Sequence, residues 1–198
     1  MHQFFITFAR EPKTRNMNQF HLTLNENSPA IQWANTQADK IGAKGHVGTH
    51  LDCYTTVPEQ KEYLLSAIVL DCRSGMPHCK DIQDLPALKN KALILHTGNL
   101  EKNEYGSEKY FLKNTSLTDE VLKEILNKEP VFIILDSHGI AEKGAKHIAF
   151  DKQCEECGCH VIENADFSSL KDETEIELLI RINISHPSTG KPCELYRK

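Results

Sequence analysis

The chain has 198 residues, a length that suits one globular domain with a sizeable hydrophobic core. Its apolar fraction of 39% and charged fraction of 26% exclude a disordered polypeptide. The net charge of −5 is modest and neither sign forms a long run, so nothing electrostatic favours a nucleic acid or an anionic membrane as a partner.

The apolar runs are too short to span a bilayer, and the first residues show no basic segment followed by a long apolar one. The seven cysteines are an odd number, which fits reduced thiols better than a disulfide framework. We therefore expect one domain over residues 1–198 in a cytoplasmic protein, and we expect a homo-oligomer.

In chain order, residues 1–40 show no clear period. Apolar runs bounded by turn residues or charges predict buried strands at residues 67–71, 92–95 and 131–135. Ser116-Leu117-Thr118-Asp119 is typical of a helix start, and the apolar residues that follow it have helical spacing.

A second helix is predicted over about residues 141–157, with Gly158 as its left-handed C-terminal cap. A short strand at residues 161–162 and an alternating one at 177–184 complete the pattern. Strands and helices interleave, so the predicted class is α/β, a single domain with a mixed sheet.

The segment Gly45-His46-Val47-Gly48-Thr49-His50-Leu51-Asp52 carries most of the chemical information. Its glycines argue against a helix, whereas an extended strand would place His46, His50 and Asp52 on one side. Two imidazoles and a carboxylate suit zinc, manganese or iron, and Gly48 would leave room for the ion. From spacing alone, a solvated strand with two ordinary histidines remains an alternative.

This segment resembles the His-x-Gly-Thr-His-x-Asp signature of the cyclase-like metal-dependent hydrolases, which include bacterial kynurenine formamidase and isatin hydrolase. The similarity continues, in the family's order, through Leu95-His96-Thr97-Gly98, Tyr105 to Phe111, Leu117 to Glu120, Ile134 to Ser137 and Val161-Ile162-Glu163-Asn164. It covers about residues 42–198 and implies the family's swivelling β/β/α arrangement.

The resemblance implies a metal site with one or two divalent ions, zinc or manganese. Its ligands would be His46, His50, Asp52, which could bridge two ions, and Glu163. His147 best matches the remaining family histidine, and Asp151 one helical turn later would orient its imidazole. The implied reaction is hydrolysis of an amide-type C–N bond, a formamide or a cyclic amide, in a small molecule, without an organic cofactor.

Two positions depart from the family. The signature normally continues to a proline and then to a histidine that moves protons in the formamidases, and Tyr54 and Thr56 stand there in this chain. A hydroxyl cannot replace that base near neutral pH. We predict that His138, after the strand that ends near Asp136, is the substitute acid/base. Tyr54 is the other candidate, because it would share the ligand face if the strand continued.

Two alternatives remain from the sequence. The chain could bind metal without catalysis, because the family base is missing. It could instead be an interaction protein held by a structural zinc on Cys154, Cys157 and Cys159. Cys53 is expected to point away from the ligands by alternation, and His160 to lie on the strand face opposite Glu163.

Overall fold

The computed structural model describes residues 18–27 and 29–198, in which eight strands form one mixed sheet. The strands are β1 (Asn18–Gln19), β2 (His50–Asp52), β3 (Glu62–Asp71), β4 (Ala92–His96), β5 (Phe132–Leu135), β6 (His160–Glu163), β7 (Glu175–Ile182) and β8 (Gly190–Arg197). Their order is β1-β8-β2-β6-β5-β4-β3-β7, and β7 also pairs with β8. Seven strands therefore close into a barrel, and β1 extends the sheet beside β8.

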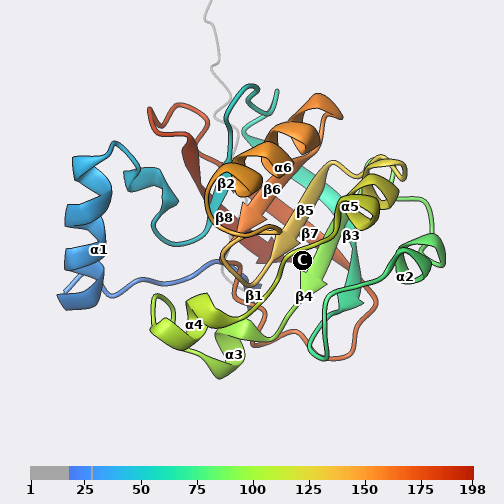
Figure 1. Ribbon diagram of the computed structural model, residues 1–198, viewed down its shortest axis with the longest axis horizontal. Helices are drawn as coiled ribbons and strands as arrows, with labels where there is room; N and C mark the ends of the chain where they lie inside the picture. Colours follow the sequence, from blue (N-terminus) through green and yellow to red (C-terminus); the bar gives the residue numbers. More distant parts are fainter. Residues whose placement is uncertain (1–17, 28) are drawn as a thin grey trace, which may run out of the picture.

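The helices lie outside the barrel (Figure 1). They are α1 (Pro29–Lys40), a 3-10 helix (Lys44–His46), α2 (Cys79–Gln83), α3 (Asn99–Lys102), α4 (Glu108–Leu112), α5 (Asp119–Leu126) and α6 (Ala145–Glu156). None of the helices in the described part of the chain is long and apolar enough to cross a membrane.

Successive side chains along each strand point to opposite faces of the sheet, so the buried apolar residues form two hydrophobic clusters. The first contains side chains from all seven barrel strands and none from a helix, so it fills the barrel; Leu51, Ile134 and Ile162 belong to it. The second joins outward-facing residues of β4, β5 and β6 to helices α2, α5 and α6. On β2, Leu51 points into the barrel, which leaves His50 and Asp52 facing outward.

The predicted α/β class with a mixed sheet is confirmed, and the implied β/β/α arrangement takes the form of this closed barrel with outer helices. The predicted strands correspond to β3, β4, β5, β6 and β7. The helix after Thr118 is α5, and the Thr118 hydroxyl accepts a hydrogen bond from Val121 N. Of the segment 1–40, for which no period was found, residues 1–17 lie outside the described residues.

Two predictions of local structure were wrong. Residues 45–48 are not a strand, because Lys44–His46 form a 3-10 helix and Gly48 has a φ of +81°. The helix predicted from residue 141 begins at Ala145, because Gly144 has a φ of +109° and a ψ of −142°, which no other residue adopts readily. Its end was predicted well, since Gly158 is left-handed at φ +72°.

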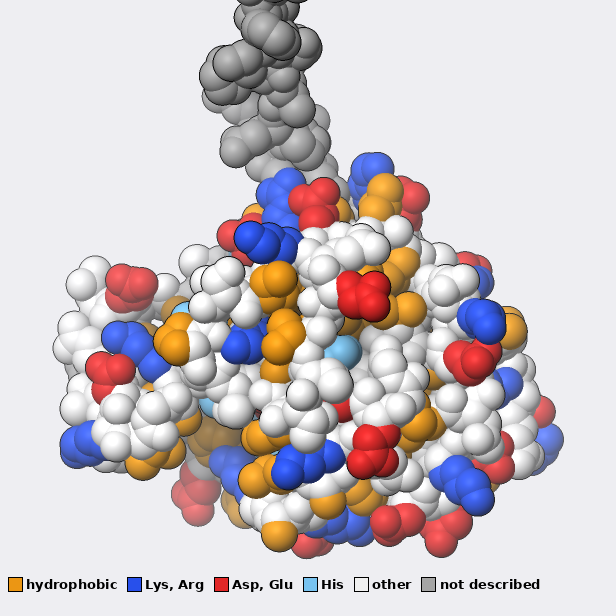
Figure 2. All heavy atoms as spheres, turned by 90° about the horizontal axis from the view of Figure 1, so that it is seen from above, with side chains coloured by type: hydrophobic (Ala, Val, Ile, Leu, Met, Phe, Trp, Pro, Cys, Tyr) orange, Lys and Arg blue, Asp and Glu red, His pale blue; other side chains and the backbone are white. Residues whose placement is uncertain are grey.

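Charged side chains of both signs are interspersed over the face in Figure 2, without a large area of one sign. This distribution agrees with the small net charge of the sequence.

Candidate metal centre

A strand pair and one helix bring the predicted ligands together. His50 lies directly opposite Glu163 in the antiparallel pairing of β2 with β6. His46 ends the 3-10 helix that precedes β2, and His147 lies in α6, which covers these strands (Figure 1). All five predicted ligands therefore meet outside the barrel, under α6.

The first group consists of His46, His50 and Asp52. His46 Nδ1 is 3.2 Å from His50 Nε2 and 3.0 Å from Asp52 Oδ1, and His50 Nε2 is 3.3 Å from the same oxygen. Ligand bonds of about 2.1 Å place neighbouring ligand atoms about 3.0–3.4 Å apart. The three atoms therefore have the spacing of one face of a coordination sphere.

The second group is built on His147. Its Nε2 is 3.2 Å from Asp52 Oδ2, 3.6 Å from Glu163 Oε1 and 3.2 Å from Asp151 Oδ2. The other oxygen of Glu163, Oε2, is 3.7 Å from His50 Nε2 in the first group. Asp52 and Glu163 thus each direct one carboxylate oxygen toward each group.

Several of these buried polar atoms have no hydrogen-bond partner among the described residues, namely Asp52 Oδ1, His147 Nδ1, Glu163 Oε1 and both Asp151 carboxylate oxygens. Burial and the neighbouring Asp52 and Asp151 carboxylates raise the pKa of Glu163 well above its usual value. Burial and Asp52 likewise raise the pKa of Asp151 to about 7. Buried carboxylates this close together need a cation, so the residues fit a divalent metal ion.

Asp52 behaves differently from its neighbours. Burial alone would raise its pKa, but the adjacent imidazoles of His147, His46 and His50 hold that pKa well below the usual range. Asp52 is therefore the ionised carboxylate at the centre of both groups.

Gly139 is a site residue that the sequence analysis missed. A Cβ atom at this position would lie 2.6 Å from His147 Cε1 and 2.8 Å from Glu163 Oε1. Gly48, expected to make room for the ion, does not do so, because its Cβ would meet Leu24 at 2.9 Å. Position 48 requires glycine because its φ is positive. The space beside the candidate ligands is left by the missing side chain of Gly139.

A pocket of about 300 Å³ opens onto these ligands. Besides ligands, its wall contains Tyr105, Tyr110, Phe111, His138, Lys143, Gly144 and Asn164. The prediction that His138 lies in the pocket is confirmed. Burial, with Lys143 and His147 nearby, lowers the pKa of His138 to about 4, so its imidazole is neutral at pH 7.

The chain turns away after Asp52, so the continued strand expected at Tyr54 is absent. The backbone N–H groups of Tyr54, Thr55 and Thr56 each donate to the Glu155 carboxylate of α6 at 2.6 Å. Tyr54 is not among the pocket-lining residues, and burial with nearby carboxylates raises its pKa. Thr56 lines a different hollow, where its hydroxyl is 3.4 Å from His160 Nε2.

The cysteines form no metal site in the described part of the chain, where the candidate clusters contain only histidine, aspartate and glutamate. Cys154 and Cys159 are buried, and Cys157 is exposed, so the structure does not support the zinc-held interaction protein. Cys53 lies inside the barrel, as alternation predicted, and burial raises its pKa to about 12.

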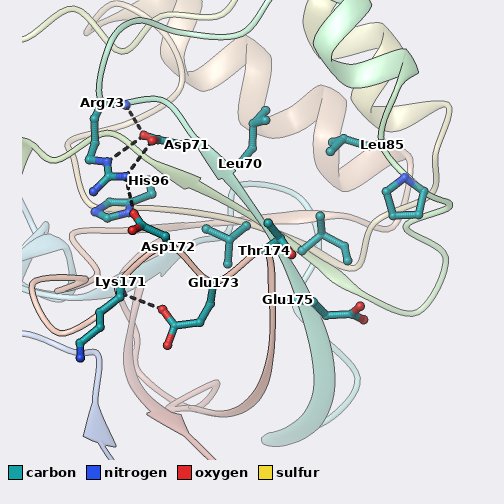
Figure 3. A pocket seen from close by; sticks show the side chains of 13 residues that line it. Leu70, Asp71, Arg73, Leu85, His96, Lys171, Asp172, Glu173, Thr174 and Glu175 are labelled. Carbon is teal, nitrogen blue, oxygen red and sulfur yellow. Dashed lines mark hydrogen bonds and ion pairs between the residues drawn. The ribbon is translucent and has the colours of Figure 1, made fainter.

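A larger cavity of about 450 Å³ lies beside β3 and shares no lining residue with the metal pocket (Figure 3). The Arg73 side chain there pairs with Asp71 at 2.7 Å and with Asp172 at 3.3 Å. None of the buried side-chain atoms that lack a hydrogen-bond partner among the described residues lines this cavity, which distinguishes it from the metal pocket.

Several solved structures resemble this fold. The potential metal-dependent hydrolase with cyclase activity has 14% identity and a TM-score of 0.70, over 92% of this chain and 96% of that one. Isatin hydrolase A from Labrenzia aggregata, bound to benzyl benzoate, has 12% identity and a TM-score of 0.61, over 92% and 94%. An isatin hydrolase bound to thioisatinate has 13% identity and a TM-score of 0.58, over 100% and 87%.

These structural likenesses show the shared fold. Among curated protein sequences, none matches the chain. The sequence itself matches the cyclase family over residues 11–142, which is more than half of its length. The chain belongs to the cyclase family.

Proposed function

We propose that the protein is a metal-dependent hydrolase that cleaves an amide-type C–N bond, a formamide or a cyclic amide, in a small molecule. The observation that carries this proposal is the pair of buried carboxylates, Asp52 and Glu163, each directed at two histidine-containing groups. Membership of the cyclase family and the isatin hydrolases among the structural neighbours support it.

The proposal includes one or two ions of zinc or manganese. His46, His50 and Asp52 would hold one ion, and His147, Asp52 and Glu163 would hold the other. A bound divalent ion lowers the pKa of water and polarises a carbonyl.

His138 is the proposed acid/base. Its neutral imidazole can accept a proton from the attacking water and return it to the departing nitrogen. Ser137 Oγ lies 3.2 Å from Nδ1, and the Tyr110 and Phe111 rings contact the imidazole edge-on, so its orientation is fixed. We propose His138 rather than Tyr54 because only His138 lines the pocket.

A panel of N-formyl aromatic amines, isatin-like lactams and cyclic imides tests the reaction after loading with zinc or manganese. His50→Ala should lose the metal and all turnover. His138→Ala should keep the metal and lose about 10²–10⁴-fold in kcat, the usual contribution of general acid–base catalysis. Full activity in His138→Ala would rule out the proposed acid/base.

The second candidate is a metal-binding protein without catalysis. It is favoured by Thr56, which replaces the family base and faces Glu155 and His160 rather than the metal pocket. Stable metal in His138→Ala and in the unchanged protein, with no turnover of any amide in the panel, would favour this candidate.

A further inference from the structure

Lys143 lies at the rim of the metal pocket, just before α6. Its ammonium nitrogen is 3.5 Å from the centroid of the Phe111 ring. Among the described residues no carboxylate pairs with this ammonium, whereas Lys146, close by in the chain, pairs with Asp119 at 3.4 Å. Lys143 is therefore a cation that the protein places at the pocket without a counter-ion.

The same residue connects the pocket to a second hollow of about 320 Å³. Phe111, His138 and Lys143 line both spaces, and Lys113 lines the second one. A ligand that lies on the metal groups can thus extend past Lys143 toward a second lysine. The acidic groups of the metal pocket lie at the other end, around Asp52 and Glu163, and Glu142 is the acidic residue that lines the second hollow.

Aromatic rings form the wall between the two ends. The His138 ring centroid is 5.4 Å from that of Tyr110 and 5.5 Å from that of Phe111. Such a surface suits a flat, apolar body, and Phe111 keeps 43% of its surface exposed for contact. Burial lowers the pKa of Lys143 while Glu163 opposes that effect, and the residue as a whole remains exposed at the rim, where a ligand can reach it.

We propose that the substrate is an anionic aromatic amide, with its amide carbonyl at the metal centre, its ring along Phe111 and His138, and a carboxylate at Lys143. This inference rests on the proposed hydrolase function, which supplies the amide; the anion site itself rests on Lys143. Lys143 is then the residue that determines specificity for charged over neutral substrates.

The kinetic test compares formanilide with 2-, 3- and 4-formamidobenzoate, which differ from it by one carboxylate. The metal-loaded protein should show at least one carboxylated isomer with a KM about tenfold or more below that of formanilide, the scale of a hydrogen bond to a charged group. Lys143→Gln should remove this advantage, so that the ratio of the KM of formanilide to that of the carboxylated isomer falls to about one. Lys146→Gln, the matched control, should retain it. Equal KM values in the unchanged protein, or an advantage that survives in Lys143→Gln, would overturn the proposal.

A binding test separates this proposal from the hydrolase function. Calorimetry on the metal-loaded protein would compare benzoate with phthalate, isophthalate and terephthalate, whose second carboxylate can reach Lys143. Tighter binding of a dicarboxylate that disappears in Lys143→Gln but persists in Lys146→Gln supports the anion site. If no amide is hydrolysed while this gain is present, the hydrolase proposal fails and the anion site stands. No gain for any dicarboxylate overturns the anion site.

Discussion

At the scale of single residues, the metal centre depends on space as much as on ligands. Gly139 has a φ of +120° and lies against two candidate ligands, since a Cβ there would lie 2.7 Å from His147 Nδ1 and 2.8 Å from Glu163 Oε1. We expect Gly139→Ala to push these side chains apart and weaken metal binding about 10–100-fold, as changes next to ligands do.

The control for this substitution is Gly158→Ala. Gly158 also has a positive φ, +72°, but no atom lies within 4 Å of its Cβ position. This variant should lose about 1–2 kcal/mol of stability from backbone strain and keep its metal affinity. Titration with a competing chelator measures the metal affinity of each variant. Equal losses of metal affinity in Gly139→Ala and Gly158→Ala would mean that backbone strain, and not the lost space beside the ligands, weakens binding.

His138 gives a prediction about pH. Its pKa of about 4 lies below the usual value because burial and the positive charges of Lys143 and His147 disfavour the imidazolium. The unfolded chain therefore takes up this proton first as the pH falls, so the contribution of His138 to stability declines between about pH 6.5 and pH 4.

NMR titration of the His138 ring measures this pKa directly. Lys143→Gln removes a positive charge and should move the pKa of His138 upward. A pKa of His138 near 6.5 in the unchanged protein would contradict the burial of this ring.

At the scale of elements, α6 is unusual because it buries polar side chains beside the apolar Phe150 and Cys154. His147, Asp151 and Glu155 follow one another at intervals of four residues, so they share one side of the helix. Asp151 and Glu155 are buried; His147 contacts Asp52 of β2, Glu155 contacts Thr55 just after it, and Asp151 pairs with His147. A search for apolar residues at helical spacing cannot locate such a face, although the family resemblance selected His147.

Glu155 fixes the chain after Asp52. Its carboxylate accepts three backbone N–H groups, from Tyr54, Thr55 and Thr56, and also the Thr55 hydroxyl. We expect Glu155→Gln to lower the free energy of unfolding by about 2 kcal/mol. The charged carboxylate accepts hydrogen bonds on two oxygens, whereas the glutamine amide has a single, neutral acceptor oxygen. Glu156→Gln, at the exposed neighbouring position, should change it little.

The pH dependence of this effect has a defined sign. Burial opposes ionisation, but the hydrogen bonds from Thr55, Tyr54 and Thr56 leave the pKa of Glu155 below its usual value. The stabilisation is therefore complete at neutral pH and is lost as the pH falls below the usual carboxyl range. Denaturant unfolding at pH 7 and pH 3 should show a larger difference between Glu155→Gln and the unchanged protein at pH 7 than at pH 3.

The predictable elements share a simple pattern. Strands β4 and β5 are continuous apolar runs buried on both faces, so composition alone identifies them. Strand β8 escaped prediction because Gly190, Lys191 and Pro192 begin it and charged residues interrupt it. The sequence Gly45 to Gly48 was assigned to a strand because alternation of side chains carries no information about a positive φ.

At the scale of the whole molecule, closure of the barrel could not be predicted from the sequence. It depends on the register of β7 with β8, in which Ile180 lies opposite Leu195, and local patterns do not specify which strands pair. The metal residues were predictable for a different reason. Four of them lie in two short motifs, and the sheet brings those motifs together by pairing His50 with Glu163.

Because the metal groups join β2, β6 and α6, ion binding should stabilise the entire fold. Binding only to the folded state contributes about 4 kcal/mol when the free metal is at 1,000 times its Kd. For a chain of this size that corresponds to a rise of about 10 °C in Tm. Calorimetric scans of the chelated and the zinc- or manganese-loaded protein measure this shift.

His50→Ala removes a ligand and should abolish the rise in Tm. Without that ligand the ion no longer binds the folded state tightly enough to stabilise it. His78→Ala, at an exposed histidine that starts α2, should leave the rise intact. Chelation should also leave the barrel closed, because the apolar cluster inside it contains none of the metal ligands. A rise in Tm that persists in His50→Ala would mean that the ion binds away from the β2–β6 strand pair.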